Sequence, residues 1–141
     1  MHLAPRILAV AAAATLLAAA PASAQIAPTL SSPSNGKSIK RGVPFTFKAK
    51  LDSASEGSGV FLKVSKSKKV GADGTLSNDI YFRSMKQSGG QWAKKVERYA
   101  ALSDHFLNRP GRYYWQAYSI DCSGGTDDCN IESTIRSFRI K

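Results

Sequence analysis

Few residues in this 141-residue chain could carry catalytic chemistry, and the most suggestive three are consecutive. Ser103, Asp104 and His105 are the residue types of a hydrolase triad, but three neighbouring side chains cannot line up as nucleophile, base and orienting group. The sequence also lacks a Gly-x-Ser-x-Gly nucleophile elbow, a histidine-rich metal set and a phosphate-binding glycine loop. We therefore expect no enzymatic activity and no cofactor.

The two cysteines, Cys122 and Cys129, enclose the six residues SGGTDD. A catalytic redox pair normally has only two residues between its cysteines, and a metal site would need a second pair or a nearby histidine. An even pair of cysteines in an exported chain is expected to be oxidised. The sequence therefore predicts a disulfide that closes the tip of a hairpin between the last two strands.

Three acidic residues around this loop, Asp121, Asp127 and Asp128, raise the question of a calcium site, because hard cations bind several carboxylate oxygens. The segment lacks the regular Asp-x-Asp-x-Asp spacing and the closing Glu of a dedicated calcium loop. We expect solvated turn residues without a bound metal, so calorimetric titration with calcium should show no heat.

Two basic runs could bind anionic partners. The chain has 20 Lys and Arg against 10 Asp and Glu, a formal net charge of +10, and such a surplus favours acidic partners. Basic side chains interleaved with aromatic ones hold polyanions through charge and stacking. The alternative is a solvated strand face whose lysines protect a sheet edge. The first run comprises Lys63, Lys66, Lys68 and Lys69, and the second comprises Lys94, Lys95 and Arg98.

The compartment is predicted from the N-terminus. One positive charge, Arg6, precedes 14 apolar or nearly apolar residues (7–20), and a small-x-small site ends at Ala24. This is the layout of a secretory signal peptide, and it is shorter than the roughly 20 residues that span a bilayer as a helix. We expect a signal peptide over 1–24 and a single domain over 25–141. The net charge of this domain is +9, because Arg6 is the one charged residue of the signal peptide. The mature protein should be secreted, extracellular or associated with the cell envelope, without a transmembrane segment.

Short alternating segments between turn residues predict an all-β domain. Residues 43–52 (VPFTFKAKLD) place four apolar side chains on one face and Thr46, Lys48 and Lys50 on the other. Further strands are expected within 60–70, 80–87, 91–99, 112–121 and 133–141, separated by turn signals such as Asp73-Gly74 and Gly89-Gly90. Six or seven short strands with frequent turns indicate an antiparallel sandwich or barrel.

Three stretches carry a resemblance to a known family: SPSNG ahead of a PFTFKA strand, RPGRYYWQAYSID, and a terminal IRSFRI. Together they resemble bacterial extracellular immunoglobulin-like domains of the fibronectin type III kind, over most of residues 26–141. The resemblance implies an antiparallel β-sandwich of about seven strands in two sheets and says almost nothing about a ligand. The long basic middle of this chain, residues 63–95, departs from that family.

The resemblance also implies roles for the aromatic strand. Tyr113 would be the tyrosine-corner residue, tied by its hydroxyl to the backbone upstream. Side chains of opposite parity would face opposite sides of the sheet. Those expected to face inward are Tyr113, Trp115 and Ala117, and those expected to face outward are Tyr114, Gln116 and Tyr118.

Two classes of function are compatible with these observations. The first is an exported, non-catalytic binding or adhesion module that engages an anionic glycan, a cell-wall polymer or an extracellular protein. Its contact residues would be Tyr114, Tyr118 and the lysines of the first basic run. The second is a structural or envelope-associated accessory protein without a dedicated ligand site. No specific nucleic-acid binding is expected, because the sequence has no nucleic-acid-binding signature.

Overall fold

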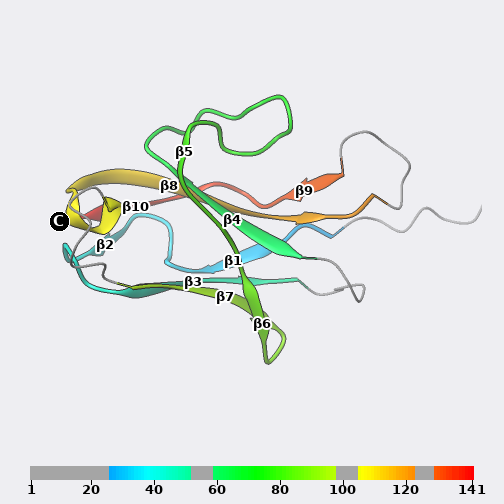
Figure 1. Cartoon of the computed structure of the whole chain (residues 1–141), viewed down its shortest axis with the longest axis horizontal. Helices are drawn as coiled ribbons and strands as arrows, with labels where there is room; N and C mark the ends of the chain where they lie inside the picture. Colours follow the sequence, from blue (N-terminus) through cyan, green and yellow to red (C-terminus); the bar gives the residue numbers. More distant parts are fainter. Residues whose placement is uncertain (1–25, 52–58, 98–104, 123–128) are drawn as a thin grey trace, which may run out of the picture.

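The alternating segments form two β-sheets that pack face to face in the computed structural model (Figure 1). The structure describes residues 26–51, 59–97, 105–122 and 129–141, so the expected signal peptide lies outside the described residues. The smaller sheet has the order β1-β3-β7-β6, with β1 at Thr29–Ser32, β3 at Phe45–Lys50, β7 at Gln91–Val96 and β6 at Lys86–Ser88.

The larger sheet has the order β2-β10-β8-β4-β5, and β9 pairs with the far end of β8. Its strands are β2 at Lys37–Ile39, β10 at Arg136–Ile140, β8 at Gly111–Ile120, β4 at Val60–Ser65, β5 at Asp79–Ser84 and β9 at Asn130–Glu132. The β2–β10 pairing is parallel, and the other pairings among the described strands are antiparallel. The predicted two-sheet antiparallel sandwich is confirmed.

The core lies between the sheets and is mainly aromatic. Phe47 of β3 and Trp115 of β8 are fully buried, and their ring centroids lie 4.9 Å apart. Phe138 of β10 stacks on Tyr113 at 5.5 Å and meets Phe47 edge-on at 5.7 Å. Alternation along β8 puts Tyr113, Trp115 and Ala117 on the inner face with no exposed surface, as predicted.

The outer face of β8 differs from the prediction. Gln116 and Tyr118 are only 3% and 7% exposed. The β4–β5 loop (66–78) lies over Gln116, and Phe61 of β4 stacks on Tyr118. Gln116 accepts a hydrogen bond from the Leu76 backbone N–H at 2.9 Å and donates one to the Gly74 carbonyl at 3.3 Å. Thr75 and Leu76 of the loop are themselves fully buried. Part of the basic segment 63–95 therefore covers the outer face of the larger sheet.

Within the predicted strand 91–99, the structure has β7 at Gln91–Val96. A 3-10 turn, η1, spans Phe106–Asn108 ahead of β8. Among the described residues, no helix is long and apolar enough to cross a membrane.

Candidate functional site

The tyrosine corner builds one end of the sandwich. The buried Tyr113 hydroxyl donates to the Arg109 carbonyl at 2.7 Å and lies 3.1 Å from the Phe106 carbonyl, which confirms the upstream backbone bond expected of this residue. Arg109 N–H also donates to the Phe106 carbonyl, at 3.1 Å. These bonds fix η1 against the start of β8, so the side chains of η1 have a defined position.

A pocket of about 350 Å³ opens between η1, β5 and the start of the β4–β5 loop. This volume lies within the range of small-molecule sites. Three cationic side chains line it: Lys66, Arg83 and Arg109. The rest of its described lining consists of Ile80 and four ring-bearing residues, Tyr81, His105, Phe106 and Tyr113.

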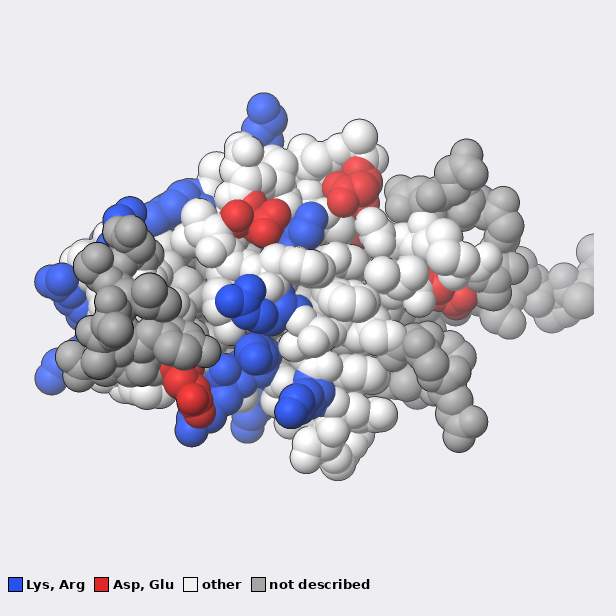
Figure 2. Space-filling model, viewed as in Figure 1, with Lys and Arg blue, Asp and Glu red and all other residues white. Residues whose placement is uncertain are grey.

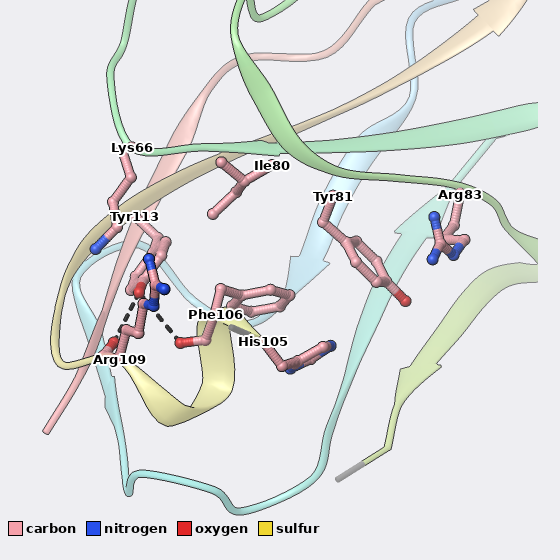
Figure 3. A pocket seen from close by; sticks show the side chains of 8 residues that line it. All are labelled: Lys66, Ile80, Tyr81, Arg83, His105, Phe106, Arg109 and Tyr113. Atoms are coloured by element: carbon pink, nitrogen blue, oxygen red, sulfur yellow. Dashed lines mark hydrogen bonds between the residues drawn. The ribbon is translucent and has the colours of Figure 1, made fainter. Parts of the chain in front are cut away.

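The cations lie at opposite sides of this pocket, as Figure 3 shows. Lys66 and Arg109 are beside Tyr113, and Arg83 is at the other side, beyond Tyr81. Ile80 and Phe106 lie between them. Because Ile80 is 48% exposed, the middle of the pocket presents apolar surface to a ligand.

Two of the cations are held by aromatic rings. The Lys66 ammonium lies 3.9 Å from the centre of the Tyr113 ring, and the Arg83 guanidinium lies 4.7 Å from that of Tyr81. Neither joins the ion pairs found among the described residues. A ring face attracts a cation without neutralising it, so both side chains keep their positive charge for an anion.

His105 is a ring of the pocket wall with a lowered pKa. Burial is the main cause, and the nearby Arg83 charge adds to it. The imidazole stacks on Phe106 at 4.8 Å, and its Nδ1 accepts a hydrogen bond from the Leu107 N–H at 3.3 Å. The neutral ring therefore carries its hydrogen on Nε2. The other two residues of the triad-like sequence, Ser103 and Asp104, lie outside the described residues.

The first basic run does not form one surface. Lys63, on β4, is half-buried and donates to the Thr75 hydroxyl at 2.7 Å, with the Asp73 carboxylate at 3.8 Å. Lys66 belongs to the pocket, whereas Lys68 and Lys69 are exposed on the loop and do not line it. The run divides because β4 ends at Ser65, where strand alternation stops.

The two tyrosines expected to face outward, Tyr114 and Tyr118, differ from each other in how far they are buried. Tyr114 is half-buried. Tyr118 was expected to be exposed, and this is wrong, because its ring stacks on Phe61 at 5.5 Å and the Lys63 ammonium lies 5.8 Å from the ring centre. Burial raises the pKa of Tyr118, and the charges of Asp73 and Asp79 raise it further.

A group of exposed lysines lies instead on the outer face of the smaller sheet. In the register of the sheet, Lys48 pairs with Ala93, which pairs with Lys86 on the other side, so the three share one face. Lys50 is two residues from Lys48 on β3, and Lys95 is two residues from Ala93 on β7. Because alternate residues of a strand lie on the same face, Lys50 and Lys95 share this face too. We call Lys48, Lys50, Lys86 and Lys95 the lysine face.

Beside the lysine face is a hollow of about 310 Å³, lined by Lys86, Ala93, Lys94, Lys95 and Glu97. Figure 2 shows Lys and Arg gathered over the side where β5 leads into β6 and β7. Arg98, of the second basic run, lies outside the described residues. The alternation within 43–52 already placed Lys48 and Lys50 outward, but their association with Lys86 depends on strand pairing.

The predicted disulfide is present between Cys122 and Cys129, whose Cα atoms are 4.6 Å apart. It joins the end of β8 to the start of β9, next to the hydrogen bond from Asp121 N–H to the Cys129 carbonyl at 2.8 Å. Asp127 and Asp128 lie outside the described residues, so the prediction of a metal-free loop stays a prediction.

No family model and no curated protein matches this chain. Among solved structures, the chain is similar to the fibronectin(III)-like modules of Clostridium thermocellum CbhA, with a TM-score of 0.51 and 17% sequence identity. The match covers 81% of this chain and 94% of that one. At this identity the likeness establishes the fold alone, a fibronectin type III-like β-sandwich.

Proposed function

We propose that this protein is an exported, non-catalytic binding module that holds an anionic polymer of the cell surface or cell wall on its lysine face. The fibronectin type III-like fold suits a binding or structural role. The disulfide suits an oxidising compartment outside the cytoplasm. Neither of these identifies the partner, so the proposal depends on the arrangement of charge.

The observation that carries the proposal is the spacing of the lysines on one face of the smaller sheet. Strands lie about 4.8 Å apart and alternate residues of one strand about 7 Å apart. Lys48 and Lys86 are therefore separated by about 10 Å across the sheet, and Lys48 and Lys50 by about 7 Å along it. Among the described residues, Glu97 is the acidic side chain within ion-pair distance of this group, 3.3 Å from Lys95. A linear polyanion lying on the face would meet several ammonium groups at once.

The test is retention of the disulfide-bonded protein on immobilised polygalacturonate and dextran sulfate over a salt gradient. The variant Lys48→Gln/Lys50→Gln/Lys86→Gln removes three charges from the lysine face. The matched control Lys37→Gln/Lys68→Gln/Lys69→Gln removes three charges from exposed lysines elsewhere. We expect the face variant to elute at clearly lower salt than the control, since salt screens exposed charges.

Equal elution of the two variants would show that net charge alone causes retention. If the unmodified protein is not retained on either matrix at low salt, the polymer-binding proposal is wrong and the structural accessory role takes its place.

A further inference from the structure

We propose that the pocket between η1 and β5 is a subsite for the carboxylated sugar rings of a polyuronate. This deepens the proposed function and rests on it, because it states which class of anionic polymer the protein holds. It concerns a part of the molecule separate from the lysine face, and its residues are different.

The cations of the pocket are suited to carboxylates. One Arg83 Nη donates to the Phe82 carbonyl at 2.6 Å, which orients the planar guanidinium. A guanidinium has five N–H groups, and its fork matches the two oxygens of a carboxylate. Lys66 contributes a point charge from the opposite side of the pocket (Figure 3).

The apolar middle of the pocket argues for a ring between the charges. An inorganic anion would use one set of cations and leave the exposed Ile80 side chain facing water. A sugar ring has apolar C–H faces that pack on such side chains, while its carboxylate reaches the cation at one side. The pocket volume of about 350 Å³ also exceeds what a small inorganic ion fills. Cations at both sides suit two successive uronic acid units better than one.

The site is held in shape before a ligand arrives. Gly111 has φ +146°, and a Cβ at this position would lie 3.0 Å from Lys66 Nζ, so the absence of a side chain lets the lysine settle on the Tyr113 ring. Ring contacts hold both Lys66 and Arg83, and hydrogen bonds hold η1. Little side-chain ordering is left to oppose binding.

The pocket and the lysine face are joined in the chain. Arg83 is near the end of β5 in the larger sheet, and Lys86 begins β6 of the smaller sheet three residues later.

The experiment titrates the ¹⁵N-labelled protein with galacturonate, digalacturonate, galactose and inorganic phosphate, and follows amide shifts of η1 and β5. We expect digalacturonate to bind at least tenfold more tightly than galacturonate, and galactose not to bind measurably. Arg83→Gln and Lys66→Gln should each weaken digalacturonate binding at least fivefold. Lys68→Gln, an exposed lysine of the same loop outside the pocket, should leave it unchanged.

Ile80→Thr keeps a β-branched side chain but removes apolar surface, so it should weaken digalacturonate binding without changing the response to phosphate. Phosphate binding as tight as digalacturonate, or shifts unaffected by Arg83→Gln, would overturn the subsite. Retention of the Arg83→Gln protein on dextran sulfate separates the two proposals. The subsite can fail while retention persists. If the lysine-face variant loses retention and still binds digalacturonate, the lysine face causes retention on the polymer and the pocket binds its ligand independently.

Discussion

Replacing Tyr113 by Phe tests whether the tyrosine corner stabilises the end of the sandwich that carries the pocket. The substitution keeps the ring, which is fully buried and packs on Phe138 and Phe106 at 5.5 and 5.6 Å. It removes only the hydroxyl. The Phe106 carbonyl keeps its bond from the Arg109 N–H, so the main loss is the 2.7 Å bond to the Arg109 carbonyl.

A buried acceptor that loses its donor costs about 1–3 kcal/mol, and the bond to the Arg109 carbonyl is partly buried, so we expect the free energy of unfolding to fall by about 1 kcal/mol. For a domain of this size, that corresponds to a decrease in Tm of about 4 °C. Urea unfolding measures the change, and the m-value should not change, because the same surface is exposed on unfolding.

Tyr114→Phe is the matched control, since it removes the same hydroxyl from the next residue of β8. Tyr114 is half-buried, and the structure gives its hydroxyl no hydrogen bond within the described residues. This control should change the free energy of unfolding by less than about 0.5 kcal/mol. If the two variants lose equal stability, or if Tyr113→Phe loses less than about 0.5 kcal/mol, the hydroxyl does not hold η1 in the way described.

Three other perturbations follow from the described contacts. Cys122→Ser/Cys129→Ser opens a short loop and should lower the free energy of unfolding by about 2.5 kcal/mol in urea melts, whereas equality with the oxidised protein would contradict a structural role. Gly111→Ala should lower the free energy of unfolding by about 1–3 kcal/mol, because an L side chain rarely adopts φ +146°. The added methyl group should also displace Lys66 and weaken digalacturonate binding. Unchanged digalacturonate binding would be evidence against the packing of Lys66 beside Gly111. The hydrogen bonds that Asp73 receives hold its pKa below the ordinary value, so its contribution to stability is complete above that ordinary pKa and is lost as pH falls through the lowered one. The difference in unfolding free energy between the unmodified protein and Asp73→Asn should therefore shrink on acidification, and a difference that grows would have the wrong sign.

Local alternation predicted the parts of the fold that depend on neighbours in sequence. Phe47 and Trp115 lie inward because side chains of a strand alternate, and the core contact between them follows from the packing of two such faces. The spacing of the cysteines and the expected oxidising compartment predicted the disulfide. The upstream bond of Tyr113 was implied by the resemblance of its strand to fibronectin type III domains, and it is present.

Long-range contacts account for what the sequence did not predict. The burial of Gln116 depends on the β4–β5 loop, which is tied to β8 by the hydrogen bond between Gln116 and Leu76, 40 residues apart. The burial of Tyr118 depends on Phe61 of the neighbouring strand β4. Gln116 in an outward position was a possible signal, since a buried amide needs partners and a nearby loop can supply them. The pocket draws its lining from the β4–β5 loop, β5 and the η1 region, so no local pattern indicates it.

The tyrosine corner connects stability with binding at this end of the molecule. The hydroxyl of Tyr113 fixes η1, and the face of the same ring positions the Lys66 ammonium at 3.9 Å. Phe at this position would keep the ring face and lose the hydroxyl, so it separates the two roles. The Tyr113 ring holds the Lys66 ammonium without neutralising it, so this charge is available to an anion. In an ion pair such as Lys63–Asp73, the carboxylate neutralises the lysine. The same sandwich therefore uses its lysines in two ways. One anchors the cover over β8, and the other remains charged beside a pocket where an anion can reach it.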